Sequence, residues 1–573
     1  MSSARESLIE ILKNESERIR NSYPSEDVIF PIIEIIRAID YYSFLLRHDL
    51  NIEKQQLLLD RYLYGWAHAF SIFYADLSLT DNIPLFKFSK KDKEWLDSII
   101  QHSGSIQICQ QHLDFEKADL IKLTSFDNQK FQFEFLVETP GSEYFEIQSL
   151  AYYHSITEEA LEFRITPLKL KLPEMRKKLN PLVKVFHEDF ISYQASDEAD
   201  LFYSELGYVQ MMTSQIIDEF DQTDIFGGIQ YKDYMDLVED NFGSALMHRD
   251  CCMALAEKTS HQIFLRNILS YCFSKEAFLS VLEKMRKLNK EKVSQIISCL
   301  TISKENYQYH LNYPGANPAP FFQVGNDTLI RSDYGSLSNP VFFLNRELKR
   351  KYPIDYFNAV NRRELRFKKQ LYDLFPSDRI IKILDNVEIK VAGRSTDIDA
   401  VLFDKDRLVL GLFQLKWQDS FSNSSKERFS RITNLVPKSV EWIDKIQDWI
   451  KSNDSQSLLR TLKIEGLNKI NDIHLFVLAR NHVHFTNTEL DKRASWGSWF
   501  QLLEASAKVK DPFNTNPIGE LAAKLNFFSP NMRREIEEPL IHQDIEFSFS
   551  KYQVSIKGKK CESDVQSDSL KEI

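Results

Sequence analysis

The residues of this sequence whose types and spacing could do chemistry flank two apolar runs near position 400. Asp397 and Asp399 stand directly before the first run, while Gln414 and Lys416 close the second run. An unpaired lysine is too costly to bury, so a strand that turns polar at its end opens into a cleft. Two carboxylates, an amide and an ammonium group are therefore expected to line one cleft.

An antiparallel hairpin is the simplest structure that brings these four side chains together. The polar segment 404–407 separates the two runs, and a turn at its centre sets Asp397 opposite Gln414. In the same register, Asp399 lies opposite Leu412. Because opposite and diagonal residues of an antiparallel pair share a face, all four polar side chains are expected to project to one side.

Apolar periodicity places this hairpin between further helices and strands. The predicted neighbours are a helix at 361–375, a strand at 386–391, a helix at 440–450 and a strand at 473–478. Glu364 lies on the first of these helices. The predicted chain order is helix, strand, strand, strand, helix and strand.

This order resembles the PD-(D/E)xK nuclease superfamily, whose members carry an acidic residue on the first helix and an Asp entering the second strand. Gln414-x-Lys416 leaves the third strand, so the chain is most similar to the Mrr-type restriction endonuclease branch, which has Gln-x-Lys in place of Glu-x-Lys. The resemblance covers about residues 345–505.

By this resemblance, Asp399 ligates a divalent cation and Gln414 adds a neutral oxygen, a hard ligand set that suits Mg²⁺ or Mn²⁺. Lys416 orients the attacking water and helps to neutralise the charge of the transition state. Glu364 holds the metal or its water from the helix. Asp397 is the other candidate metal ligand, and placement within the family favours Asp399 as the primary one.

Positive charge is concentrated in the same part of the chain. Residues 341–450 carry 21 Lys and Arg against 16 Asp and Glu, a local charge of +5 in a chain of formal charge −11. Basic side chains that flank a site are the groups that contact phosphates. The expected nucleic-acid contacts are Arg362, Arg363, Lys368, Lys369 and Arg394.

Length and pattern predict a multidomain α+β protein. At about 150 residues per domain, 573 residues are too many for one core. The N-terminal half is expected to be largely helical with a small β insertion, and the C-terminal part to be an α/β restriction-endonuclease-like domain with a mixed central sheet. The expected units are a helical domain at 1–125, a small β-containing insertion at 126–180 with strands at 130–137 and 161–165, a helical domain at 181–305, a Pro-rich connector at 306–344, the nuclease-like domain at 345–540, and a C-terminal strand pair with a flexible tail at 541–573.

Composition argues against a membrane protein and favours the cytoplasm. Apolar residues make up 43% of the chain, and no run approaches the roughly 18 uncharged apolar residues that a membrane span needs. The 6 Cys show no metal-ligand spacing, and the first residues lack the apolar core of a secretory signal. We expect a cytoplasmic protein whose helical half contacts a second copy of itself or a partner protein.

The preferred prediction is a metal-dependent endonuclease that hydrolyses DNA, in restriction of or defence against foreign DNA. The alternative is a non-catalytic nucleic-acid-binding or scaffold protein that retains the nuclease fold. A further alternative, with RNA as the substrate, is a ribonuclease that acts through the helical half, because Arg61-x6-His68 on a predicted helix faintly resembles the Arg-x(4–6)-His pattern of HEPN-type ribonucleases. A helix packed in a core is the preferred interpretation of that pair. For His482 and His484, ordinary histidines at a strand end are preferred over a metal pair.

Overall fold

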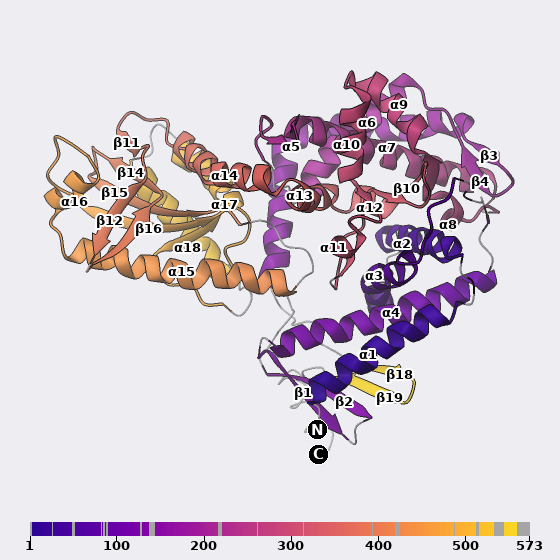
Figure 1. Cartoon of the computed structure of the whole chain (residues 1–573). Coiled ribbons are helices and arrows are strands. Elements are labelled where there is room, and N and C mark those ends of the chain that lie inside the picture. The colour runs from indigo at the N-terminus through magenta and orange to yellow at the C-terminus, as the bar shows by residue number, and fades with distance from the viewer. Residues whose placement is uncertain are drawn as a thin grey trace, which may run out of the picture.

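The chain folds into a mixed α/β structure, which confirms the predicted multidomain α+β layout (Figure 1). Within the described part of the chain, no helix is long and apolar enough to cross a membrane. The computed structural model describes residues 3–23, 25, 27–48, 52–81, 83, 86–87, 90–117, 119–126, 129–136, 144–215, 220–260, 262–312, 314–391, 393–418, 425–485, 488–510, 515–531 and 544–557.

Helices at the N-terminus pack with a small sheet to which both ends of the chain contribute. The helices are α1 (Ala4–Asn21), α2 (Ile29–His48), α3 (Ile52–Tyr74) and α4 (Lys90–Lys117). The strands are β1 (Ile121–Phe126), β2 (Lys130–Phe135), β18 (Ile545–Phe549) and β19 (Tyr552–Ile556), in the order β1-β2-β19-β18.

The predicted strand near 130 and the predicted C-terminal strand pair therefore lie in one sheet, in which β19 runs parallel to β2 (Figure 1). Phe547 and Phe549 alternate with polar residues along β18, and both are buried in the core that α1, α3 and α4 share. The tail at 561–573, predicted to be flexible, lies outside the described residues.

The next part of the chain forms a second, mostly helical core. Its helices are α5 (Tyr144–Leu179), α6 (Asp197–Ser214), α7 (Tyr231–Lys258), α8 (Leu265–Ile268), α9 (Lys275–Arg286), α10 (Lys290–Cys299), α11 (Tyr307–Leu311), α12 (Asp333–Leu337) and α13 (Pro340–Lys351), with the short 3-10 helix η1 (Asn180–Leu182). A sheet of order β7-β10-β9-β8 contains β7 (Tyr271–Ser274), β8 (Thr301–Ile302), β9 (Phe321–Gln323) and β10 (Thr328–Arg331). Two hairpins pair β3 (Lys184–Phe186) with β4 (Phe190–Ser192) and β5 (Ile225–Phe226) with β6 (Ile229–Gln230). We call residues 4–351, with the strands β18 and β19, the helical region.

The weak strand predicted at 161–165 is wrong, because this segment lies inside α5. Phe163, expected on a buried strand face, is 75% exposed. The residues that α5 packs into the second core recur at helical spacing: Leu168, Leu172, Met175 and Leu179. Apolar residues at helical spacing over about three turns are stronger evidence for a helix than an alternation of five residues is for a strand.

The Pro-rich segment 306–344 was predicted as a connector, but it is packed into both cores: Phe322 lies in the core of the N-terminal helices and Phe321 in the second core. Phe321 and Phe322 of β9 are fully buried, and β9 pairs with both β8 and β10. Prolines are excluded from strand interiors and fit the turns between short elements, so four of them here indicate many turns and do not indicate a linker.

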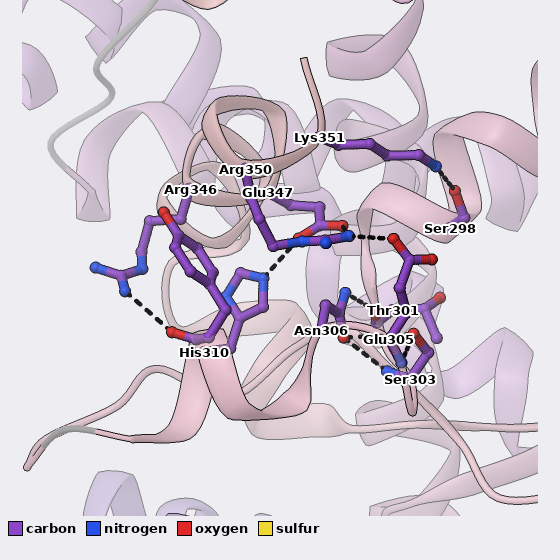
Figure 2. Close-up of polar contacts among 11 residues, drawn as sticks. Ser298, Thr301, Ser303, Glu305, Asn306, His310, Arg346, Glu347, Arg350 and Lys351 are labelled. Atoms are coloured by element: carbon purple, nitrogen blue, oxygen red, sulfur yellow. Dashed lines mark hydrogen bonds and ion pairs between the residues drawn. The ribbon is translucent and has the colours of Figure 1, made fainter. Parts of the chain in front are cut away.

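A buried polar network ties this segment to α13 (Figure 2). His310 Nε2 lies 2.9 Å from a carboxylate oxygen of Glu347, and both side chains are almost fully buried. Arg350 donates two hydrogen bonds of 2.8 and 2.7 Å to the same carboxylate. Asn306 accepts from the Ser303 backbone N–H at 2.8 Å and so closes the preceding turn. Because these buried polar groups are satisfied by one another, the network fixes α13 against the segment before it.

The C-terminal part, residues 353–531, forms a layered structure that we call the α/β unit. Its helices are α14 (Pro353–Asp373), α15 (Ser425–Lys451), α16 (Ser455–Thr461), α17 (Trp499–Lys510) and α18 (Pro517–Asn531). Its strands are β11 (Ile380–Ile383), β12 (Val387–Val391), β13 (Arg394–Ile398), β14 (Ala400–Asp404), β15 (Val409–Lys416), β16 (Asp472–Ala479) and β17 (Ser495–Ser498). The predicted elements around the hairpin are all present, and β11, β13 and β17 are additional strands.

A mixed sheet of order β11-β14-β15-β16-β17 forms the centre of this unit. β11, β14 and β15 are antiparallel neighbours, whereas β15, β16 and β17 run parallel. β12 and β13 form a separate two-stranded ribbon. Along β15, Leu410 and Leu412 bury one face under α15 and α16, while Phe413 and Leu415 bury the other under α14, α17 and α18. A strand apolar on both faces is therefore an interior strand, as its sequence predicts.

One helix, α14, belongs to both parts of the protein. Tyr356 and Ala359 near its start are buried in the core of the helical region, whereas Phe367 and Leu371 near its end are buried in the α/β unit. Figure 1 shows α14 passing from one body into the other. Because the two ends of α14 are buried in different cores, the positions of its middle residues are fixed relative to both cores.

Candidate active site

The hairpin β14–β15 is present, but its register differs from the predicted one by two residues. Ala400 pairs with Phe413 and Asp404 with Val409, so Asp399 stands opposite Gln414 and not opposite Leu412. The cause is a four-residue loop. The Asp404 carboxylate accepts hydrogen bonds from the backbone N–H groups of two loop residues at 3.0 and 3.2 Å, and Leu408 adopts a φ of 58°. An even shift leaves every side chain on its predicted face.

Asp397 is not part of this ladder, contrary to the prediction that it faces Gln414. The strand breaks at Asp399, and Asp397 pairs instead with Glu388 of β12. The Trp442 indole N–H donates to the Asp397 carbonyl at 2.7 Å and holds the ribbon against α15. The exposed carboxylate of Asp397 is still close enough to raise the pKa of Asp399.

Asp399 is a buried carboxyl group at the start of β14, with an exposed fraction of 9%. Its Oδ2 accepts a hydrogen bond of 2.7 Å from the Leu415 backbone N–H. Burial raises its pKa to about 6, Lys416 and the Leu415 N–H oppose that rise, and the charges of Asp397 and Glu364 add to it. Ionisation of Asp399 is therefore unfavourable in its surroundings, and a nearby cation would stabilise the ionised form.

Gln414 lies opposite this carboxyl group with its amide oxygen unused. The side chain is 7% exposed, and Oε1 has no hydrogen-bond partner among the described residues. A buried oxygen without a partner is destabilising by about 1–3 kcal/mol, and such groups gather where a ligand is bound. Lys416 is half-buried at the end of the same strand, and its charge favours the ionised form of Asp399.

Helix α14 brings two more charged groups to the site. Glu364 is exposed, and its charge raises the pKa of Asp399. Lys368, one turn later, is 4% exposed and donates to the Asp385 carbonyl at 3.1 Å and to Asn386 Oδ1 at 3.2 Å. Burial lowers the pKa of Lys368, and the neighbouring charge of Asp399 opposes that fall. The charges of Lys416, Glu364 and Lys368 therefore all act on Asp399, and Gln414 lies on the same strand as Lys416, two residues before it.

The predicted phosphate contacts fall into two groups. Lys369 and Arg394 are exposed, as a phosphate contact requires, and Arg362 is exposed but ion-paired with Asp224, its Nε 2.9 Å from the carboxylate. Arg363 and Lys368 are buried, so for these two the prediction of a phosphate contact is corrected. The guanidinium of Arg363 lies 3.7 Å from the ring centroid of Phe220 in the helical region. The sequence could not show this, because Phe220 is far from α14 along the chain.

The weaker candidates have structural surroundings. β16 ends at Ala479, before His482 and His484, and His484 is buried beside Gln501. His68 lies 2.9 Å from the Ser16 hydroxyl, and burial lowers its pKa to about 4. Arg61 lies over the ring of Phe547 at 5.1 Å. These positions favour the packed-helix interpretation of the Arg61 and His68 pair.

The donor set fits a divalent cation that keeps part of its water shell. Among the described residues, no group of three or more His, Cys, Asp or Glu side chains is arranged to hold a metal ion. Mg²⁺ is commonly held in proteins by one or two carboxylates, with waters and substrate phosphates completing six oxygens. Asp399 offers a carboxylate whose ionised form needs a cation, and Gln414 of the neighbouring strand offers a buried oxygen without a partner among the described residues. Asp397 or Glu364 would contact such an ion through water.

Sequence reasoning missed three residues next to the site. Trp417, Arg480 and Trp499 stack on one another at the end of the sheet. Trp417 directly follows Lys416 and was visible as an aromatic residue after the motif, but its neighbours depend on how parallel strands align. No family model, curated protein or solved structure matches this chain.

Proposed function

We propose that this protein is a metal-dependent endonuclease that hydrolyses DNA phosphodiester bonds. Its active site is formed by Asp399, Gln414 and Lys416. The observation that carries the proposal is the Asp399 carboxyl group: buried, its pKa raised to about 6, and placed opposite an amide oxygen without a partner. Neither feature stabilises the fold. Both become favourable when a divalent cation with hard-oxygen preference lies between them.

The chain's own residues have distinct roles in this reaction. Asp399 and Gln414 would hold Mg²⁺ or Mn²⁺, which when bound polarises the scissile phosphate and lowers the pKa of a water. The Lys416 ammonium group, at the end of β15, orients the attacking water and neutralises charge that develops on the phosphate. Glu364 accepts a hydrogen bond from water on the helix side of the cleft. Lys368, which is buried on α14, offsets part of the negative charge of Asp399.

DNA is the proposed substrate because of the resemblance of residues 345–505 to Mrr-type nucleases, and because Lys369 and Arg394 of the same unit are exposed. We place the reaction in the cytoplasm, in restriction of or defence against foreign DNA. The helical region, which holds α14 from its other end, would then sense a signal or bind a partner protein or a second copy.

A second candidate is a nucleic-acid-binding scaffold that keeps the fold without the reaction. It is favoured by the lack, in the described ranges, of three acidic or histidine side chains grouped as metal ligands. Such a protein would bind DNA by charge alone and would show the same affinity with and without Mg²⁺.

The test is cleavage of labelled duplex DNA, single-stranded DNA and RNA of one sequence, each in Mg²⁺ and in EDTA. The proposal predicts cleavage of DNA that requires Mg²⁺. Binding without cleavage of any substrate supports the scaffold. RNA cleavage in EDTA that is lost in His68→Ala and kept in Lys416→Ala would move the active site to the helical region.

A further inference from the structure

Three adjacent parallel strands end at the same level beside the candidate active site. Lys416 pairs with Ala479, and Ala479 pairs with Ser498, each the last residue of its strand. The next residue of each strand therefore stands in one row across the sheet. The residues of this row, in the order β15, β16 and β17, are Trp417, Arg480 and Trp499.

The row is a stack in which the arginine lies between two indoles. The guanidinium carbon of Arg480 is 4.7 Å from the ring centroid of Trp417 and 4.6 Å from that of Trp499. These distances match the spacing of neighbouring strands, about 4.8 Å, so the sheet itself sets the stack. Arg366 of α14 extends it, with its guanidinium 4.8 Å from the Trp417 ring.

Buried aromatic packing makes this stack rigid. Phe367 is fully buried beneath it and meets both indoles edge to face, at 6.1 Å from Trp417 and 5.9 Å from Trp499. Arg480 is fixed further by two hydrogen bonds. Its backbone N–H donates to the Lys416 carbonyl at 2.9 Å, and its Nη1 donates to Gln370 Oε1 at 3.2 Å. The side chain is half-buried, as are both indoles.

An arginine with an indole ring on either side of its guanidinium can meet a ligand through its N–H edge, in its own plane. In-plane donation is the geometry in which arginine binds phosphate with two parallel hydrogen bonds. The carboxyl ends of parallel strands are also where α/β sheets bind ligands. We propose that Arg480, mounted between Trp417 and Trp499, binds a backbone phosphate of the nucleic acid next to the one that is cut.

This inference rests on the proposed function, since Lys416 of the active site and Arg480 are joined by a backbone hydrogen bond. It adds a substrate contact outside the acidic cleft. Arg366 and Lys416 place two further positive charges beside the same row, so a strand of phosphates is drawn along the end of the sheet and past Asp399.

The test is binding of a short fluorescein-labelled DNA duplex to the full-length protein in Ca²⁺, followed by anisotropy over a range of salt. The variants are Arg480→Gln and Arg480→Lys. The matched control is Arg493→Gln, an arginine of the same unit that is ion-paired with Asp444 and Asp491. Urea unfolding of each variant shows whether the fold is kept, and Arg480→Lys keeps the charge if Arg480→Gln is unstable.

We expect Arg480→Gln to weaken binding at least about tenfold and to lower the salt slope by about 1. Arg480→Lys should weaken binding by about threefold or more, because it loses the planar fork, and Arg493→Gln should bind like the wild type. Unchanged affinity of both Arg480 variants, in a protein that cuts DNA in Mg²⁺, would overturn the phosphate role and leave the proposed function standing. A wild type that neither binds nor cuts DNA would overturn both.

Discussion

Replacing Asp399 by Asn should make the metal-free protein more stable, although it removes the centre of the proposed site. Burial and like charges raise the pKa of this carboxyl group from 3.8 to about 6, and a rise of that size corresponds to roughly 3 kcal/mol. Because the pKa is raised on folding, the ionised group destabilises the native state in full above about pH 6. The effect fades as the pH falls from about 6 to 3.8 and is absent well below 3.8, where the carboxyl group is protonated in both states.

Asn cannot ionise, and its side-chain oxygen can still accept the Leu415 backbone N–H, now at 2.7 Å from Asp399 Oδ2. The loss of a charged acceptor offsets part of the gain, so we expect Asp399→Asn to be more stable by about 1–3 kcal/mol in EDTA at pH 7.5. Divalent cation should narrow this difference. With Kd near 1 mM, Mg²⁺ at about 10 mM would stabilise the wild type by about 1.4 kcal/mol and the variant not at all.

The assay is urea unfolding followed by tryptophan fluorescence, since five of the 7 Trp residues lie in the α/β unit. Asp406→Asn, in the exposed turn at the far end of the same hairpin, is the control, and it should change stability by less than about 0.5 kcal/mol and keep the response to Mg²⁺. If Asp399→Asn is less stable than the wild type in EDTA by about 1 kcal/mol or more, Asp399 is a structural hydrogen-bond acceptor and the reasoning is refuted.

Three further predictions follow from the same geometry. Gln414→Leu should raise the free energy of unfolding in EDTA by up to about 1 kcal/mol, because it removes a buried oxygen that has no partner among the described residues. The same variant should bind Mn²⁺ more weakly. If urea unfolding shows Gln414→Leu to be less stable than the wild type, that oxygen has a structural role. Mn²⁺ affinity, measured by electron paramagnetic resonance, should fall about tenfold per pH unit below pH 6, because protons compete with the metal for Asp399, whose pKa is raised to about 6. An affinity that does not change between pH 7 and pH 5 would exclude Asp399 as the metal ligand. Arg363→Ala should lower the free energy of unfolding by about 2 kcal/mol, because its guanidinium lies 3.7 Å from the centroid of the Phe220 ring. The double variant with Phe220→Ala should lose about 1–2 kcal/mol less than the sum of the two single losses, and fully additive losses would show that the two side chains do not interact.

Periodicity in the sequence was sufficient for the elements directly around the hairpin and for the faces of the hairpin, but it did not reveal β11, β13 or β17. The pattern of β15, apolar on both faces until Gln414, required an interior strand, and β15 lies between β14 and β16 in the sheet. The register was not predictable in the same way. The register depends on a four-residue loop in which the Asp404 carboxylate accepts two backbone hydrogen bonds and Leu408 adopts a positive φ. The same sequence is also compatible with a two-residue turn.

Contacts between distant segments account for the other differences. Arg363 looked like a surface cation on an amphipathic helix, but Phe220 covers it from the helical region. Asp397 leaves the hairpin because Trp442 holds its carbonyl. The row of Trp417, Arg480 and Trp499 exists only because three strands end in register, and no pattern within one strand encodes that alignment.

Nicking of supercoiled plasmid DNA by the wild type, Lys416→Ala and Lys405→Ala, in Mg²⁺, Mn²⁺ and EDTA, tests the central claim most directly. Lys405 lies exposed in the turn at the opposite end of the hairpin from Lys416 and serves as the matched control. We predict nicking that needs metal, is retained in Lys405→Ala and falls at least about a hundredfold in Lys416→Ala. Equal nicking by Lys416→Ala and the wild type, or no nicking in either metal, would contradict a nuclease centre at Asp399, Gln414 and Lys416.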